Sequence, residues 1–463
     1  MTEDLVVHAD PDKLFFISML IKDIELVPAV LDLVDNCVDG ARALSIEEGT
    51  QGSDHPYSGR RVDINSGRDA FEITDNCGGI DLDTARSYAF RFGRSKDYKG
   101  VAGSVGEFGV GMKRSLFKLG KQFEVKSRSK SSEFVLKVDV DKWAAETDPE
   151  WTFRLSSAKS NLKPPPAKQL GTTIKVTGLH DTVSEDFASH LVIGQLRQQL
   201  RLRHQGAIQN GLLIHLNGER LTLHLPQLLS GPSFKPFNRS MVLNEVQGDV
   251  SVRVIAGIAA LEGKGEDQLN DGDAQDFRSP SDAGWWVFCN ERLLLYADKT
   301  ALTGWGSSGA AYHPQYRRFR GYVYLSASDT ALLPWNTTKT GVDQDSRVWR
   351  KVLAVMQTAL VEVQAVINKI KSEGEEADIP GSTSVTASLA TATPVPVREL
   401  PESQSVEYPK PPPRRRKPKS EQKVQFNVER NRYEAVAEVL DATTTSEVGR
   451  GVFDYFYDRE IEE

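Results

Sequence analysis

The segment that most constrains the fold runs from Asp23 to Leu44, DIELVPAVLDLVDNCVDGARAL. Its apolar residues recur every three or four positions, which is the period of a helix with one buried side. Asp23 can cap such a helix, and Pro28 is close enough to its start to be tolerated. The segment therefore predicts an amphipathic helix on which a core is built.

The polar side of this helix carries two carboxylates and an amide. Asp32, Asn36 and Asp39 are spaced i, i+4 and i+7, so they share one side, whereas Asp35 faces elsewhere. Such a row on a half-buried helix indicates a site for a cation or a polar ligand. A solvated acidic face has the same pattern, so the helix alone leaves both interpretations open.

Composition restricts the class of protein. A chain of 463 residues is long enough for two or three domains. Its net charge of −7 gives no general attraction to nucleic acid, so any such binding needs a local patch. Three widely spaced cysteines (Cys37, Cys77 and Cys289) argue against a disulfide framework or a zinc knuckle. Without a membrane-length apolar run or a signal-peptide pattern, we expect a cytoplasmic protein with no membrane partner.

A second motif follows two short strands expected at 62–64 and 71–74. The second strand leads into DNCGGI, Asp75 to Ile80. Paired glycines allow the backbone to approach a flat or phosphorylated ligand, while the aspartate accepts a hydrogen bond. An ordinary Asx or glycine turn gives a similar sequence.

A third motif is glycine-rich. The polar segment 90–103 leads to GEFGVGMKRSLFKLG, Gly106 to Gly120. Glycines before a helix present main-chain N–H groups, and the helix N-terminus favours anions. Lys113 and Arg114 lie in the first turn, where cations are otherwise unfavourable, so they indicate a nearby anion. The spacing is not that of a P-loop.

The rest of the chain suggests further domains. Strands are expected at 123–127, 134–138 and Gly171–Leu179, and a helix at 185–204 would lead to a second domain. That domain would open with a hairpin at Asn217–Gly218 and close with a helix at 347–370. The expected parts are residues 1–190, residues 191–371, a disordered linker at 372–422 and a small helical segment at 423–463.

Two features of the C-terminal part suggest partners. Lys410 to Lys423 is a local basic patch that could contact DNA, RNA or an acidic partner, or could simply keep a linker soluble. Beyond it, aromatic residues cluster in a helical pattern, namely Phe453, Tyr455, Phe456 and Tyr457. We expect this appendage to dock on the chain's own core or on a protein partner.

In order and spacing, these motifs resemble the four nucleotide motifs of the GHKL ATPase superfamily, which includes type II topoisomerases, MutL, MORC proteins and the ninety-kilodalton heat-shock chaperones. VGEFGVGMKRSLFKLG together with LVDNCVDGA is most similar to MORC proteins and their prokaryotic relatives. The resemblance covers roughly residues 10 to 345. It implies an α/β fold, with a Bergerat-type sandwich that binds ATP followed by a transducer domain of βαβ character.

The resemblance also implies roles for single residues. Asn36 would coordinate a Mg²⁺ ion that bridges the ATP phosphates. Asp75 would accept a hydrogen bond from the adenine amino group, supported by Thr172, and Gly79 would give the base room. The other residues assigned to nucleotide binding, most of them in a lid hinge, are Asp39, Ser95, Lys96, Gly106, Phe108, Gly109, Val110, Gly111, Met112 and Lys113.

Catalysis would depend on two residues. Asp32 occupies the place of the family's glutamate base and is one methylene shorter. Since a misplacement of about 1 Å can cost on the order of 100-fold in rate, either helix and water adjust or hydrolysis is slow and ATP acts as a switch. Lys339 in NTTKTG matches the transducer lysine that reaches the γ-phosphate. Cys77 replaces the first glycine of the adenine motif, which predicts a slightly altered affinity for the base.

The function expected from the resemblance is an ATP-gated switch with weak ATPase activity. Two protomers would dimerise on ATP, and DNA would be the client by analogy with the family. A chaperone for protein clients, or a non-hydrolysing scaffold for a partner enzyme, is the alternative. A histidine kinase is disfavoured, because no convincing phosphoacceptor histidine helix precedes the motifs.

Overall fold

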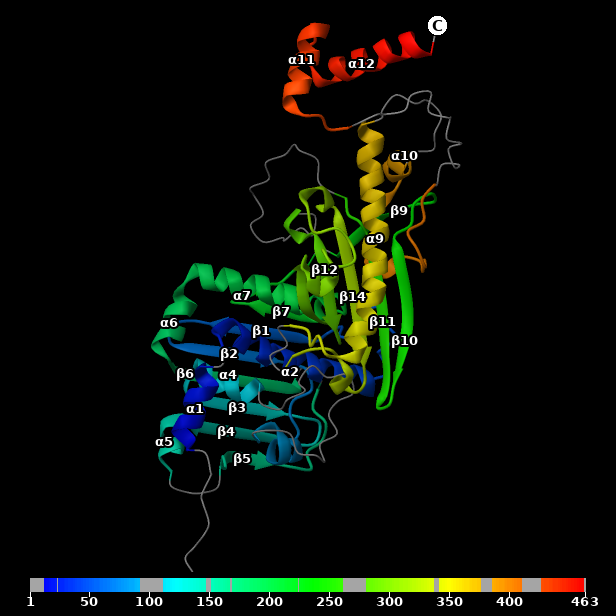
Figure 1. Cartoon of the computed structure of the whole chain (residues 1–463). Coiled ribbons are helices and arrows are strands. Elements are labelled where there is room, and N and C mark those ends of the chain that lie inside the picture. Colours follow the sequence, from blue (N-terminus) through cyan, green and yellow to red (C-terminus); the bar gives the residue numbers. More distant parts are fainter. Residues whose placement is uncertain are drawn as a thin grey trace, which may run out of the picture. The chain divides into compact units, whose positions relative to one another are not determined.

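The computed structural model describes residues 12–22, 24–91, 111–146, 151–166, 169–223, 225–260, 280–336, 341–375, 385–409 and 426–461. The chain divides into two compact units, residues 1–410 and residues 411–463. The first unit is built on two sheets, each packed against helices (Figure 1).

The first sheet has eight strands in the order β5-β4-β3-β6-β2-β1-β7-β8. Neighbouring strands are antiparallel except β1 and β7, which are parallel. The strands are β1 (Arg61–Ser66), β2 (Ala70–Asp75), β3 (Gly120–Arg128), β4 (Glu133–Asp139), β5 (Leu155–Lys159), β6 (Gly171–Leu179), β7 (Leu213–Leu216) and β8 (Glu219–Arg220). The helices of this part are α1 (Lys13–Lys22), α2 (Leu26–Glu47), α3 (Leu82–Thr84) with a π-helical turn at Ala85–Ala89, α4 (Gly111–Leu119), α5 (Val140–Ala145), α6 (Asp181–Ala188), α7 (His190–Arg203) and α8 (Gln205–Gln209).

The core of this part follows from the alternation along the strands. Every second side chain of β1 and β2 is buried, namely Val62, Ile64, Phe71 and Ile73. They pack with α2, whose Val30 and Val34 are fully buried. The helix predicted at 23–44 is confirmed with shifted ends, since α2 runs from Leu26 to Glu47. Its N-cap is Glu25, without a side-chain cap, and Asp23 lies outside the described residues.

The hairpin predicted to open the second domain belongs to the first sheet, so that prediction was wrong. Strand β7 pairs in parallel with β1, and Ile214 and Leu216 are buried in the first core. The turn at Asn217–Gly218 has the expected positive φ angles, 51° and 84°. A turn signal identifies a hairpin but not the sheet that it joins. The helix expected at 185–204 is also divided, into α6 and α7.

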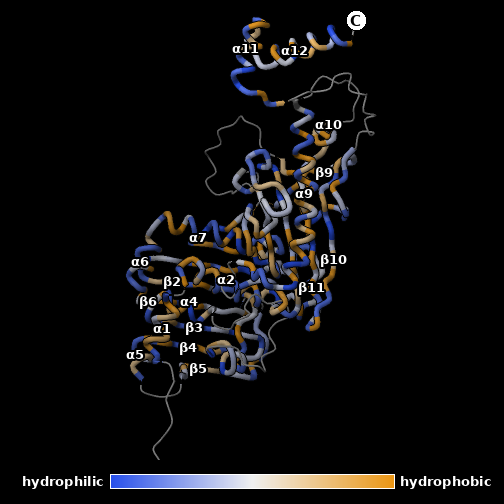
Figure 2. The backbone as a smooth tube through the Cα atoms, viewed as in Figure 1, coloured by the Kyte–Doolittle hydropathy of each residue, from blue (hydrophilic) through white to orange (hydrophobic). Residues whose placement is uncertain are grey.

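The second sheet has the order β10-β11-β14-β12-β13, with β12 and β14 parallel and the other pairs antiparallel. Its strands are β10 (Phe237–Glu245), β11 (Gly248–Ile258), β12 (Gly284–Cys289), β13 (Arg292–Asp298) and β14 (Phe319–Ala327). Helix α9 (Arg347–Glu375) packs on β11 and β14, and hydrophobic and hydrophilic residues alternate along it (Figure 2). Although α9 has the length and composition of a membrane span, its Trp349, Met356 and Val363 are buried in this core.

Part of the segment predicted as a linker is structured. Helix α10 (Val385–Ala390) packs on α9, and β15 (Thr393–Pro396) pairs with β9 (Gln227–Ser230) in a two-stranded sheet. Val397 and Leu400 are buried. The linker prediction rested on a composition rich in Pro, Ser and Thr, but a short edge strand tolerates proline.

The second unit contains α11 (Arg430–Leu440) and α12 (Thr445–Glu460), so the expected helical C-terminal segment is confirmed. A capping box between Thr444 and Glu447 starts α12. The aromatic side chains predicted to dock are exposed within this unit: Phe453, Tyr455, Phe456 and Tyr457.

Candidate functional site

The polar side of α2 holds the first part of the site. Asp32 is only 7% exposed, whereas Asn36 one turn further on is exposed and Asp39 is partly buried. The Asn36 Nδ2 donates a hydrogen bond to the main-chain oxygen of Asp32 at 3.0 Å. Because the amide nitrogen is used in this way, the amide oxygen is the atom that Asn36 can offer to a ligand.

Asp75 forms the second part of the site, at the end of β2. Its carboxylate accepts a hydrogen bond from the Cys77 main-chain N–H at 2.7 Å and lies 3.6 Å from the Cys37 thiol. Burial raises the pKa of Asp75 to about 6, although these two groups and the Thr172 main chain favour its charged form. Since Cys37 follows Asn36 on α2, the helix and the end of β2 line the same site.

Thr172, on β6, completes this side of the site. Its hydroxyl is buried and lies 3.0 Å from the hydroxyl of Ser127 on β3, which also accepts a hydrogen bond from the Ile80 main-chain N–H at 2.6 Å. Sequence reasoning missed Ser127. The available signal was its inward position in the alternation that buries Phe123 and Val125 on the same strand.

Gly79 lies where no side chain fits. Its φ is +71°, and a Cβ atom there would come within 2.2 Å of the Arg128 carbonyl oxygen. The glycine therefore lets the loop after β2 pack against the backbone of β3 and β6. Its predicted role in giving an adenine base room stays a prediction.

Several predicted residues lie outside the described part of the chain. These are Ser95, Lys96, Gly106, Phe108, Gly109, Val110 and Lys339. Of the predicted lid hinge, the described residues are those that begin α4, namely Gly111, Met112 and Lys113.

The start of α4 contacts α2 directly. A Cβ atom on Gly111 would lie 3.2 Å from the Asp32 Oδ2, so α4 begins against that carboxylate. Met112 is buried in the core. Lys113 is buried too, and its ammonium donates a hydrogen bond to the Ala89 carbonyl oxygen at 3.0 Å. Burial lowers the pKa of Lys113 to about 8.

The cation beside Asp32 is Arg114. Its guanidinium forms an ion pair with the Asp32 carboxylate, with an Nη2–Oδ2 distance of 2.8 Å, and both side chains are largely buried. The Arg114 Nε is buried and has no hydrogen-bond partner among the described residues. The basic pair at 113–114 indicated a nearby anion; for Arg114 that anion is the chain's own carboxylate.

The described residues fit a nucleotide with a magnesium ion. The Asp75 carboxylate and the Thr172 hydroxyl provide hydrogen-bonding groups for a base, and Asn36 provides a hard oxygen. Among the described residues, no group of three or more His, Cys, Asp or Glu side chains could hold a metal by itself.

A known protein family matches the part of the chain that carries most of these residues. Residues 24–171, about a third of the chain, match the family model described as histidine kinase-, DNA gyrase B-, and HSP90-like ATPase. No curated protein matches the chain. The matched segment contains α2, the β2 motif and α4, and it ends at the first residue of β6. Residues 24–171 are therefore similar to GHKL-type ATPase domains, and this match supports ATP binding by this part of the chain.

Proposed function

We propose that this protein is an ATP-gated molecular switch with slow, Mg²⁺-dependent ATPase activity. The observation that carries the proposal is the contact between α2 and the end of β2. It joins Asn36, a candidate ligand for the metal and phosphates, to Asp75, the candidate adenine acceptor, through Cys37. A site with a base pocket at one end and a hard oxygen ligand at the other is what a nucleotide with bound magnesium requires.

Each residue would have a distinct task. Asp75 would accept the adenine amino proton with support from Thr172, and Asn36 would hold Mg²⁺, which when bound neutralises phosphate charge. Asp32 would orient the attacking water and accept its proton. Lys339 would contact the γ-phosphate and so report whether that phosphate is present.

Slow hydrolysis is supported by the surroundings of Asp32. The Arg114 guanidinium already occupies Oδ2 at 2.8 Å, and the carboxylate is one methylene shorter than the family's glutamate. To act as a base, Asp32 would have to share or exchange this contact. Because hydrolysis with such a base is slow, the enzyme stays in its ATP-bound state for most of each cycle. A long-lived ATP-bound state suits a switch better than a motor.

ATP-dependent dimerisation in the cytoplasm and a DNA client are proposed from the family resemblance. The basic patch Lys410–Lys423 supports nucleic acid as the client, because clustered Lys and Arg bind phosphate backbones. The exposed aromatic residues of α12 support a protein contact by the second unit. A chaperone would instead bind unfolded protein and show no salt-sensitive binding to DNA.

The proposal is tested by measuring nucleotide binding and molecular mass together. Wild-type protein with Mg²⁺ and a non-hydrolysable ATP analogue should double its mass in size-exclusion chromatography with light scattering. Asn36→Ala should lose at least about 100-fold in affinity for the Mg²⁺ complex and should remain monomeric. Asn244→Ala, an exposed asparagine on β10, is the matched control and should behave as wild type. Retained micromolar binding by Asn36→Ala would refute the site. A series in DNA and salt concentration then tests the client.

A further inference from the structure

The turn between β12 and β13 carries an unusual residue. Asn290 and Glu291, the two turn residues, have positive φ angles of 44° and 73°. Asparagine and glycine are the usual residues at such positions, whereas glutamate adopts a left-handed conformation only at an energetic cost. The cost implies that the Glu291 side chain has a role which glycine could not supply.

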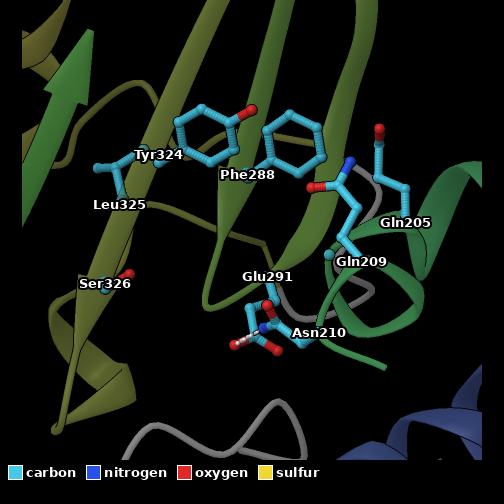
Figure 3. A pocket seen from close by; sticks show the side chains of 9 residues that line it. Gln205, Gln209, Asn210, Phe288, Glu291, Tyr324, Leu325 and Ser326 are labelled. Atoms are coloured by element: carbon cyan, nitrogen blue, oxygen red, sulfur yellow. Dashed lines mark hydrogen bonds between the residues drawn. The ribbon is translucent and has the colours of Figure 1, made fainter. Parts of the chain in front are cut away.

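The Glu291 carboxylate contacts three groups around α2. It accepts a hydrogen bond from the Asn210 Nδ2 at 2.8 Å (Figure 3). It also accepts one from the Tyr57 hydroxyl at 2.9 Å, and its Oε2 lies 3.3 Å from the Arg42 Nη2. Arg42 is on α2 itself. It also donates a hydrogen bond to the Asn290 carbonyl oxygen at 3.2 Å. The turn is therefore anchored on the second half of the helix.

The next residue along the turn reaches the first half of α2. Arg292 is buried and forms an ion pair with Asp35, which is 1% exposed. The same carboxylate lies 3.0 Å from the Nε2 of the buried His204. Asp35 directly precedes Asn36, so the buried pair lies next to the residue proposed to hold the metal.

The other side of the turn is fixed to the second sheet. The Asn290 side chain hydrogen-bonds both main-chain groups of Ala327 on β14, at 3.1 and 3.0 Å. Arg203 at the end of α7 donates to the carbonyl oxygens of Leu293 and Leu294 at 2.8 and 2.9 Å. The hairpin tip, defined as Asn290, Glu291 and Arg292, is thus fastened to α2 and to β14 at once.

The surroundings of the tip leave space for movement. A cavity of about 170 Å³ lies beside Glu291, lined among others by Gln205, Phe288, Tyr324 and Ser326 (Figure 3). Gln205 is 1% exposed, and within the described part of the chain its buried Oε1 has no hydrogen-bond partner. Because close-packed interiors resist displacement, a polar contact bordered by a cavity is easier to shift than a packed one.

We infer that Glu291 and Arg292 are positioning residues for the nucleotide site, holding α2 so that Asp32 and Asn36 face the ligand. This inference rests on the proposed function. The hairpin tip then connects nucleotide binding to the second sheet, since a displacement of α2 on binding acts on the tip and through Asn290 on β14. By linkage, bound nucleotide changes the equilibrium between two positions of the tip by a certain factor. Shifting the tip from one position to the other changes nucleotide affinity by the same factor.

The test uses Glu291→Gly and Glu291→Gln in the full chain, with Mg²⁺ and the non-hydrolysable ATP analogue as the probe. Glycine relieves the strain of the turn, which offsets part of the cost of leaving Arg42 and Tyr57 without the carboxylate, and glutamine keeps the length of the side chain while removing its charge. Urea titration of both variants checks that each is folded before binding is measured. Both variants should bind the analogue about 10-fold more weakly. In hydrogen exchange, the analogue should protect residues 284–298 of the wild type and leave them unprotected in Glu291→Gly.

The control is Glu219→Gln, in the β7–β8 hairpin, where the carboxylate pairs with Arg197 and not with α2. It should match wild type in affinity and protection. A double-mutant cycle of Arg42→Gln and Glu291→Gln should show that the two affinity losses are not additive. Wild-type affinity in both Glu291 variants, or no protection of 284–298 in the wild type, would overturn the inference. A wild type that does not bind the analogue would instead refute the proposed function.

Discussion

Helix α2 carries two aspartates three positions apart, each of which is buried and paired with an arginine. Asp32 pairs with Arg114 of α4 and lies beside the exposed Asn36. Asp35 pairs with Arg292 of the second sheet and with His204. The chemistry is alike, but Asp32 adjoins the proposed nucleotide site and Asp35 is enclosed between two parts of the fold.

The difference shows how one helix serves two purposes. A buried ion pair is a weak net stabiliser, but removing one partner leaves a charge that water cannot reach. At Asp35 that penalty acts on the junction between the two sheets. At Asp32 the carboxylate is next to an exposed residue, so a ligand or water can take the place of the arginine. The enclosed pair should therefore control stability, and the pair at the site should control turnover.

The largest expected effect is on stability. Asp35→Ala leaves the Arg292 guanidinium buried without its carboxylate, so the free energy of unfolding should fall by about 3–5 kcal/mol in urea titrations. Exchanging both partners for apolar residues, as Asp35→Leu with Arg292→Met, should recover much of the loss. If Asp35→Ala unfolds at the wild-type urea concentration, the pair does not hold the two sheets together.

The next effect is on turnover. Asp32→Asn should lower the steady-state rate of ATP hydrolysis by about 100-fold or more, because a general base contributes that much, while nucleotide affinity changes little. Asp32→Glu restores the missing methylene and should hold or raise the rate. Asp83→Asn, an exposed aspartate after the β2 motif, is the control. Normal turnover in Asp32→Asn would mean that another residue is the base. The Asp32–Arg114 pair would then not control turnover.

The features of this site that depend on neighbouring residues could be predicted from the sequence. Helical periodicity predicted α2, and the spacing of Asp32 and Asn36 predicted their shared side, with Asp35 turned elsewhere. Strand β6 was predicted with its exact bounds, Gly171–Leu179. These features depend on residues close together in the chain, for which the period of a helix or strand is a sufficient guide.

The parts that could not be predicted are contacts between distant segments. Arg292 lies more than two hundred residues from its partner Asp35, and no local pattern connects them. The same reason explains the misplaced hairpin at β7–β8, where the turn was visible and its sheet was not. Arg114 was predicted to lie near an anion, but the local sequence could not say which one, and the structure shows that it is the Asp32 carboxylate.

A third carboxylate, that of Asp75, provides the smallest expected effect. Asp75 is half-buried and accepts hydrogen bonds, and the described residues form no ion pair with it. Its pKa is about 6 in the folded protein and about 3.8 as an ordinary aspartate. The folded state therefore binds the proton more tightly than the unfolded chain. This contribution to stability is complete below about pH 4 and is lost as the pH rises through 6.

Asp75→Asn removes this titration. Between pH 5 and pH 7.5 the wild type should lose about 1 kcal/mol of unfolding free energy relative to the variant. Urea titrations at several pH values in that range give the difference between the unfolding free energies of the two proteins. Any effect of the amide that does not depend on pH cancels when this difference is compared between pH values. Asp83→Asn is again the control. A difference that stays constant with pH would mean that Asp75 is ionised as readily as an exposed aspartate, and that a cation compensates it as Arg114 compensates Asp32.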